Sequence, residues 1–450
     1  MNSIITNNIA NNIANNEITS KSINKKNKLK RNNKLADDKI IYNPNNIISL
    51  YNMSEIRENI YKKVYKKEKN YFFHVLMTHA LCDTIGFKNG DWEFNYNDML
   101  KAEILDYVNE LIYEFIDLGG INGLNIKSWL VSDDTFFHIA MAKSMLEYKN
   151  KLNEKFILKV KTNLLKEAKH IWKELSGDTT KLENYKKMNG KNRIIRYIGE
   201  TTSESIKQFT TKHDARKDNY DQLSGGNGCA MRNIVIGLCL HGENIRDELI
   251  DISIITSKLT HNNAHGYLAG FVSALFAALA MEGVPIEKWV FIMIEYLRSN
   301  KIKKFLSIDN VDEIFDYNLF VKYWQKYIDT KFDKNSKPIR NRSFANPMHR
   351  IRYFHENFHK ETPSYQIGSS GYLCMIMAYD ALLDCDGHFE KLVVYSILHS
   401  GDSDTIGSVA GGLYGAVYGF GDIPPYLFEH IERKREIIDL SNKLYDKYNS

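Results

Sequence analysis

The feature of this sequence that most limits its fold is a long stretch without proline, from Pro44 to Pro285. Proline interrupts helix interiors because its ring removes an N–H group and clashes with the preceding turn. Globular chains normally carry prolines throughout, so their absence over this length favours long helices. Patterns typical of strands are few. We therefore expect a single compact all-α domain.

Apolar residues recur every three or four positions over residues 98–117, until Gly119 and Gly120 end the run. The region from about 300 to 366 holds three prolines and is expected to be a long irregular connection between helical halves. Further helices are predicted over 135–148, 155–175, 228–241, 244–260, 265–282, 286–298, 371–384, 388–399 and 404–419.

The N-terminal region differs from the rest of the chain in composition. Residues 1–70 carry 14 Lys/Arg and 6 Asp/Glu, a net charge of +8, whereas the remainder carries 46 and 49, a net charge of −3. We predict a disordered Asn/Lys-rich tail over 1–68 and a folded domain over 69–450. A nucleic-acid-binding body would carry its own basic face. A solvated tail is the favoured interpretation, and the alternatives of nucleic-acid binding or a nuclear address concern the tail alone.

The cysteines and the longest apolar segment indicate the compartment. Five cysteines without Cys-x-x-Cys spacing favour a reducing compartment and neither disulfides nor a cysteine-bound zinc ion. The apolar segment Gly266–Met281 is interrupted by Ser273 and is shorter than a membrane span, so it predicts a buried helix. The N-terminus lacks the order of a signal peptide. We expect a cytoplasmic protein without a membrane partner.

Two segments place clustered carboxylates and hydroxyls at a predicted helix start: Ser132–Thr135 and Gly401–Thr405. Ser and Asp are ordinary N-caps, and capping explains one Asp in each segment. Adjacent carboxylates repel one another unless a cation compensates them. Hard cations such as Mg²⁺ prefer oxygen ligands. Both interpretations stay open at this point: helix caps, or a site for two Mg²⁺ ions.

Glycine is used in two further ways. Gly407, Gly411 and Gly415 recur at four-residue spacing, which predicts close packing of that helix against a neighbour. The loops Ser224–Gly228 and Gly368–Gly371 each precede a helix and expose backbone N–H groups suited to phosphate. With the acidic segments, these loops indicate a metal-assisted enzyme acting on a phosphorylated ligand.

The ordered series of motifs resembles the ADP-ribosylglycohydrolase family, most closely its ADP-ribosylarginine hydrolase branch, over residues 71–445. The chain departs from the family before Gly199, where the stretch Arg196-Tyr197-Ile198 lacks the usual Ala-Pro lead. The segments that carry the resemblance are Cys82–Gly86, Asn89–Phe94, Trp129–Thr135, Ser224–Arg232, Thr260-His261, Gly368–Gly371 and His399–Thr405.

The resemblance implies an all-α fold with two Mg²⁺ ions at the base of a cleft that holds ADP-ribose. The implied metal ligands are Ser132, Asp133, Asp134 and Asp404 for one ion, and Asp402, Asp404 and Thr405 for the other. The implied ligand-binding residues are Gly225, Gly226, Asn227, Gly228, His261, Ser369, Ser370 and Gly371, with Gly199, Glu200 and Thr201 as a third loop.

The resemblance further implies Mg²⁺-dependent hydrolysis of the N-glycosidic bond between ADP-ribose and a protein arginine. Asp133 or Asp134 would assist proton transfer, and Glu93 is a second candidate, the alternative being a surface Glu beside Trp92. Alternative functions are hydrolysis of ADP-ribosylserine or O-acetyl-ADP-ribose on the same scaffold, and non-catalytic ADP-ribose binding. The expected partners are ADP-ribose and an ADP-ribosylated protein.

Overall fold

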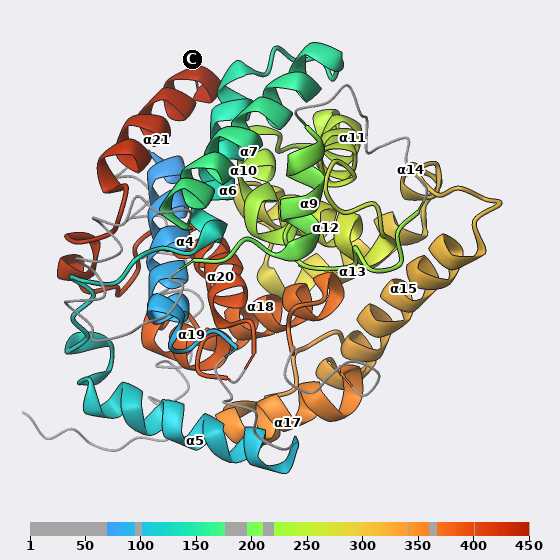
Figure 1. Ribbon diagram of the computed structural model, residues 1–450. Helices are drawn as coiled ribbons and strands as arrows, with labels where there is room; N and C mark the ends of the chain where they lie inside the picture. The colour runs from blue at the N-terminus through green and yellow to red at the C-terminus, as the bar shows by residue number, and fades with distance from the viewer. Residues whose placement is uncertain are drawn as a thin grey trace, which may run out of the picture. The chain divides into compact units, whose positions relative to one another are not determined.

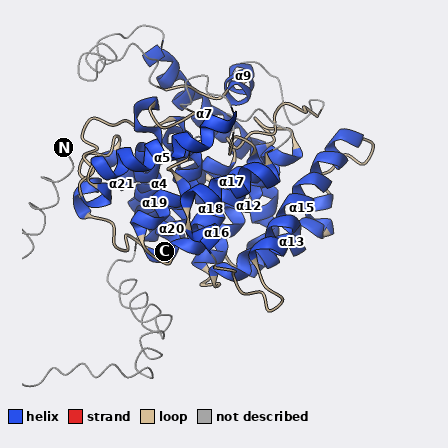
Figure 2. Ribbon diagram, turned by 90° about the horizontal axis from the view of Figure 1, so that it is seen from below, coloured by secondary structure: helices blue, strands red, loops and turns tan. Residues whose placement is uncertain are grey.

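Helices make up the regular structure of this chain (Figures 1 and 2). Outside the helices, the described residues contain only isolated bridges, such as the one between Gly226 and Ser370. The all-α prediction is confirmed, whereas the predicted tail over 1–68 lies outside the described residues. The computed structural model describes residues 70–94, 101–175, 196–209, 220–340, 342–359, 367–399 and 401–449.

The periodicity located ten of the described helices to within a few residues of their ends, but it predicted none over 71–87, 200–208 or 434–449. The first half contains α4 (Tyr71–Phe87), α5 (Lys101–Asp117), α6 (Asp133–Glu147), α7 (Glu154–Leu175), α9 (Glu200–Gln208), α10 (Ala230–Cys239), α11 (Arg246–Ser257) and α12 (Ala264–Met281). The second contains α13 (Trp289–Arg298), α14 (Asn300–Lys303), α15 (Val311–Lys331), α16 (Arg342–Ala345), α17 (Pro347–Phe358), α18 (Gly371–Cys385), α19 (Phe389–Ser396), α20 (Ser403–Tyr418) and α21 (Lys434–Asn449). Short 3-10 helices are η1 (Lys88–Gly90), η2 (Gly120–Asn122), η4 (Glu243–Ile245), η5 (Ile286–Lys288) and η7 (Pro425–Phe428).

The predicted irregular connection over 300–366 is wrong. It contains α15, a helix of 21 residues that begins at the N-cap Asn310. Its buried face is built from Phe320, Trp324 and Tyr327 among charged residues. These aromatic side chains follow helical spacing. The prolines of the segment lie beyond α15 or in the first turn of α17, where proline is tolerated.

The apolar helices α10 and α12 pack against each other in the core. Helix α12 is 89% buried, as expected of a core helix. Among the described residues it is the one helix long and apolar enough to cross a membrane. The cysteines are all buried and free, so the prediction of no disulfide is confirmed.

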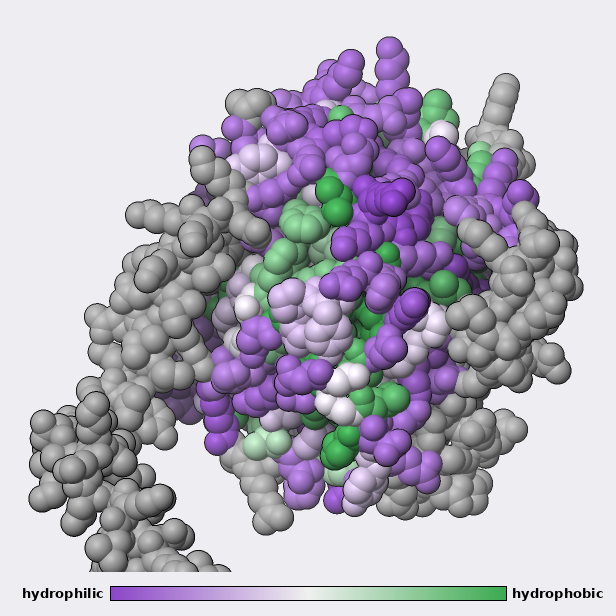
Figure 3. Space-filling model, turned by 90° about the vertical axis from the view of Figure 1, so that its left-hand side faces the viewer, coloured by the Kyte–Doolittle hydropathy of each residue, from purple (hydrophilic) through white to green (hydrophobic). Residues whose placement is uncertain are grey.

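The glycines of α20 pack it against α4, and the two helices lie side by side in Figure 1. A Cβ atom at Gly411 would lie 2.5 Å from the Cys82 sulfur, and one at Gly415 would meet the hydroxyl of Thr78. The predicted close packing is therefore confirmed. It also brings the start of α20 to α4, where Ser403 Oγ donates a 2.9 Å hydrogen bond to the carbonyl of Gly86. Figure 3 shows one outer face, on which hydrophilic side chains dominate and apolar ones gather toward the centre.

Candidate active site

The two acidic motifs meet at the N-terminal ends of α6 and α20. Ser132 is the N-cap of α6, and its Oγ accepts a 3.1 Å bond from the Asp134 N–H. The hydroxyl of Thr405 donates to one carboxylate oxygen of Asp134 at 3.2 Å, and that of Ser408 donates to the other at 2.7 Å. Asp402 holds the N-cap position of α20 without a side-chain capping bond. Capping thus explains Ser132 but not Asp402.

The carboxylates of this site repel one another. Burial first, and the neighbouring carboxylates second, raise the pKa values of Glu93, Asp133, Asp134 and Asp404 well above their ordinary range. Burial also raises the pKa of Asp402. Among the neighbouring charges, that of Asp404 raises the pKa values of Glu93, Asp133 and Asp134 most strongly. Asp404 is therefore the central charge of the group. We call these five residues the acidic cluster.

The donor set of the acidic cluster fits hard divalent cations. It offers carboxylate oxygens, the hydroxyls of Ser132 and Thr405 belong to the same two motifs, and Asp402 and Asp404 are almost fully buried. Among the described residues, no three His, Cys, Asp or Glu side chains form a ready-made cage for one metal ion. Mg²⁺ normally retains several waters and binds few carboxylates. The carboxylates therefore suit Mg²⁺ ions that are completed by water and substrate oxygens.

Asp83 on α4 holds the first motif in place, a role that the sequence-based prediction did not include. Its carboxylate accepts from the Ser132 N–H at 3.0 Å and from the Thr135 N–H at 3.1 Å. Burial and the charge of Asp404 raise the pKa of Asp83 to about 7. Its presence in Cys82–Gly86, a segment that carries the resemblance, was the available signal.

A buried ion pair holds the residue before this motif. Arg196, 4% exposed, donates to the Val131 carbonyl at 3.1 Å, and both its terminal nitrogens pair with Glu432 at 2.8 and 2.9 Å. The Val131 N–H donates to Glu432 at 3.3 Å, and Glu174 contacts the third guanidinium nitrogen at 3.1 Å. We call Arg196 and Glu432 the clamp. These residues are too far apart in sequence for any local pattern to predict the pair.

The two glycine-rich loops pair directly with each other. Gly226 forms a β-bridge with Ser370, and the Gly371 N–H donates to the Gly225 carbonyl at 3.0 Å. The Asn227 N–H donates to the Ser369 carbonyl, also at 3.0 Å. The loops precede α10 and α18, so the N-terminal ends of two helices lie beside one pair of loops.

Asn227 joins these loops to the acidic cluster. Its side-chain amide donates to Asp402 at 2.8 Å and to the Gly368 carbonyl at 3.0 Å. A diphosphate at the loops and cations at the cluster would therefore occupy adjoining parts of one site.

A family model described as ADP-ribosylglycohydrolase matches residues 67–450. The chain belongs to the ADP-ribosylglycohydrolase family. An ADP-ribosyl glycohydrolase of Acanthamoeba polyphaga mimivirus is 36% identical over 378 residues, which cover 81% of this chain and 68% of that protein. ADP-ribosylhydrolase ARH1 of Dictyostelium discoideum is 28% identical over 388 residues, covering 82% and 92%. A solved structure titled "ADP-ribosylglycohydrolase-related protein complex" is 17% identical, covers 85% of this chain and 99% of that one, and has a TM-score of 0.48.

Membership makes this chain a hydrolase with ADP-ribosyl glycohydrolase activity in the general sense. Its substrates carry ADP-ribose, and enzymes of the ADP-ribosylglycohydrolase family commonly depend on a metal. The loops and the acidic cluster are the parts of the chain whose chemistry suits such a substrate.

Glu93 is the member of the acidic cluster that lies outside the two acidic motifs. Its side chain is half-buried, and the charges of Asp404 and its neighbours add to burial in raising its pKa. The next residue, Phe94, has a left-handed φ of 44° and donates its N–H to the Gly401 carbonyl at 3.1 Å. This bond fastens the Glu93 segment to the start of the second motif. Its neighbour Trp92 is buried, and a contact between Glu93 and ligand stays a prediction.

His261 lies behind the first loop. Its Nδ1 is 2.8 Å from the Thr260 hydroxyl, and the side chain is buried. A Cβ atom at Gly228 would lie 2.9 Å from the imidazole, so the ring supports this loop from behind. A direct contact between His261 and ligand stays a prediction.

The third predicted loop is less closely joined to the others. Gly199 and Glu200 are exposed, and Thr201 is half-buried in the first turn of α9. Thr202 approaches the first loop most closely, because its hydroxyl lies 3.0 Å from the Cβ position of Gly228. Sequence-based prediction did not name Thr202. The residue of α9 that faces the first loop is therefore Thr202, which directly follows the predicted residues Gly199, Glu200 and Thr201.

Proposed function

We propose that this chain removes ADP-ribose from protein arginine by Mg²⁺-dependent hydrolysis of the N-glycosidic bond. The observation that carries this proposal is the bond from Asn227 to Asp402, which joins the paired loops to the acidic cluster. A diphosphate on the loops would place its attached ribose toward the carboxylates. Such an arrangement supports cleavage at the ribose end of the ligand.

Each part of the site would contribute a separate task. Ser132, Asp133, Asp134, Asp402, Asp404 and Thr405 would hold two Mg²⁺ ions, and Gly225–Gly228 with Ser369–Gly371 would bind ADP-ribose. When bound, the ions orient the ribose hydroxyls and activate water. Asp83 and the clamp would keep the first motif at a fixed distance from the second.

Proton transfer would fall to carboxylates of the acidic cluster. A carboxylate held beside an attacking water can accept its proton as a general base. Asp133 and Asp134 stand at the start of α6 and are themselves implied metal ligands, and Glu93 is the member of the acidic cluster that lies outside the two motifs. We assign proton transfer to Asp133 or Asp134, with Glu93 as the second candidate.

The charge of the site favours an arginine linkage over a serine linkage. A guanidinium leaving group is cationic, whereas a serine hydroxyl is neutral, and a carboxylate such as Glu93 would pair with the former. The alignment with ARH1 covers 92% of that protein, whereas the alignment with ADP-ribosylhydrolase ARH3 of Gallus gallus, 25% identical, covers 58%.

Product release from three substrates tests the proposal. Purified full-length chain with Mg²⁺ would be incubated with arginine-linked ADP-ribose, serine-linked ADP-ribose and O-acetyl-ADP-ribose, and free ADP-ribose would be measured by chromatography. We expect the arginine-linked substrate to be cleaved fastest and chelation of Mg²⁺ to stop the reaction. Faster cleavage of either other substrate contradicts the arginine assignment. Tight ADP-ribose binding without turnover contradicts catalysis altogether.

A further inference from the structure

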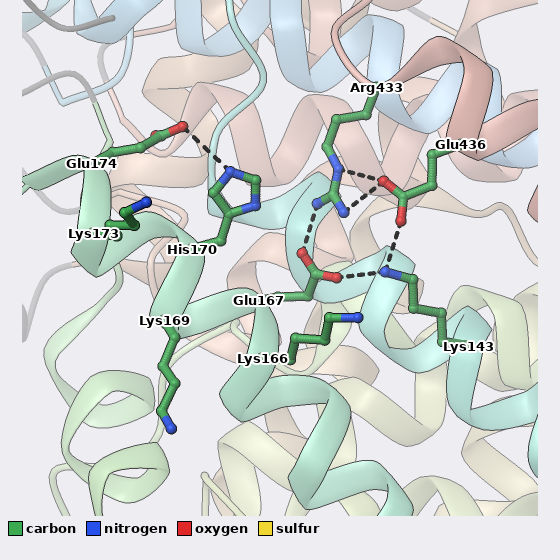
Figure 4. A pocket seen from close by; sticks show the side chains of 9 residues that line it. All are labelled: Lys143, Lys166, Glu167, Lys169, His170, Lys173, Glu174, Arg433 and Glu436. Atoms are coloured by element: carbon green, nitrogen blue, oxygen red, sulfur yellow. Dashed lines mark hydrogen bonds and ion pairs between the residues drawn. The ribbon is translucent and has the colours of Figure 1, made fainter. Parts of the chain in front are cut away.

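A groove outside the acidic cluster runs along α7, with α6 and the start of α21 as its other sides (Figure 4). It encloses about 610 Å³. Its lining contains five Lys or Arg side chains and three Glu side chains, a net charge of +2, on a body whose net charge is −3. We call it the α7 groove. Its charge is opposite in sign to that of the body that carries it.

The carboxylates of the α7 groove are already neutralised by its deeper cations. Glu167 lies between Lys143 at 2.7 Å and Arg433 at 2.8 Å. Glu436 contacts the same two cations, each at 2.7 Å (Figure 4). Glu174 pairs with Arg196 at 3.1 Å. These glutamates are thus engaged and cannot also neutralise the lysines of the rim.

The rim of the groove presents lysines along one side of α7. Lys166, Lys169 and Lys173 are three and four residues apart, and all are exposed. This spacing spreads their ammonium groups over about 10 Å of helix. Within the described part of the chain, Lys166 and Lys169 make no ion pair. The positive charges of Lys166 and Lys169 are therefore available to a ligand.

We propose that the α7 groove binds an acidic segment of a partner protein. A single phosphate prefers donors that converge on one point, above all a free guanidinium fork. Here the ammonium groups are spread out, and the guanidinium of Arg433 is occupied by Glu167 and Glu436. Carboxylates spaced along a polypeptide match this spacing, and the methylene stems of lysine pack against its backbone. The inference does not depend on the proposed reaction, because the groove contains no residue of the acidic cluster.

Charge removal at the rim tests the proposal. A fluorescein-labelled peptide of alternating Glu and Gly would be titrated with the full-length chain at low salt, and anisotropy would give Kd. We expect the Lys166→Gln/Lys169→Gln variant to bind about three- to tenfold more weakly than wild type. The matched control is Lys155→Gln/Lys288→Gln, which removes the same charge from exposed positions outside the groove and should change Kd less than about twofold.

Zero-length carbodiimide cross-linking locates the bound peptide. Because residues 1–69 are also basic, mass spectrometry of the cross-linked wild-type chain must find the peptide on Lys166 or Lys169. Cross-links confined to residues 1–69, or equal affinity of the wild type and the rim variant, would overturn the proposal. It would also be overturned if an oligonucleotide of equal charge bound more tightly with the same dependence on Lys166 and Lys169. Circular dichroism would confirm that both variants remain folded.

Discussion

Two buried groups of charged residues in this chain differ in how their carboxylates are balanced. In the first, Asp380 and Asp384 of α18 face Lys331 of α15 and Arg350 of α17. Lys331 lies 3.0 Å from Asp380, and Arg350 lies 2.8 Å from Asp384. Burial alone would raise the pKa of Asp380, but the two cations hold it below its ordinary value. We call these four residues the balanced network.

In the acidic cluster, by contrast, the partners of the carboxylates are mostly neutral. Asp134 accepts from two hydroxyls, and Asp402 accepts from the amide of Asn227. The charge of Arg196 lowers the pKa of Asp133 only slightly, and Arg196 is already paired with Glu432. Buried charges are tolerated when opposite charges compensate them. The balanced network supplies that compensation from within the chain, and the acidic cluster requires it from outside.

The largest expected effect is that of Asp404→Asn. This change removes the central charge of the acidic cluster and keeps an oxygen to accept the 2.8 Å bond from the Thr405 N–H. We expect Mg²⁺-dependent release of ADP-ribose to fall more than about 100-fold, beyond the usual effect of losing a residue that only supports a metal ligand. Without Mg²⁺, the melting temperature should rise, because repulsion is relieved. An active variant, or a melting temperature that falls, would contradict the comparison.

The same substitution at Asp380 should have the opposite effect on stability. Asp380→Asn leaves Lys331 and Arg350 buried with less compensating charge, which we expect to lower the free energy of unfolding by about 3–5 kcal/mol. Urea unfolding measures this change. If the two Asp→Asn variants shifted stability in the same direction, the distinction between the balanced network and the acidic cluster would not hold.

The clamp provides a third test, with a smaller effect. Arg196→Gln should lower kcat about 10- to 100-fold and raise the Mg²⁺ concentration needed for half-maximal activity, because Val131 is no longer held. Arg246→Gln is the matched control. Arg246 is 3% exposed at its side chain, pairs with Glu282 at 2.7 Å, and lies in α11. Equal loss of activity in both variants would indicate a purely structural role for Arg196.

The smallest expected effect is on pH dependence. Folding raises the pKa of Asp83 to about 7, so ionisation of this group lowers the stability of the folded chain as pH rises toward 7, and the loss is complete above that pH. The stabilisation of metal-free protein by Asp404→Asn should therefore be largest above pH 7 and shrink below it. Taking the difference between variant and wild type removes the contribution of buried histidines such as His79 and His399, whose pKa values burial lowers. If the difference in stability between the Asp404→Asn variant and the wild type grew as pH fell, the raised pKa of Asp83 would be contradicted.

Local pattern was enough to predict most of this fold. Apolar spacing located α6, α12 and α20 because most positions along these helices are buried and most of the buried side chains are apolar. It missed α15, whose buried face is built from widely spaced aromatic side chains among charged residues. The prolines near that segment lie outside α15, so they were a misleading signal.

The site was partly predictable for a different reason. Each acidic motif and each glycine loop is a short continuous segment of the sequence. Each lies at or just before the start of a helix, where polar residues are a recognisable signal. The clamp and Asp83 act through contacts between distant segments, which no local pattern records. The same holds for the bond from Asn227 to Asp402.

Calorimetric titration of Mg²⁺ into metal-free protein tests the requirement for an external cation most directly. The wild-type chain should bind two ions, and the Asp404→Asn variant should lose measurable binding. The Asp380→Asn variant, studied below its melting temperature, should retain it. Absence of Mg²⁺ binding by the wild type, or equal binding by the Asp404→Asn variant, would show that the acidic cluster is not balanced by metal ions.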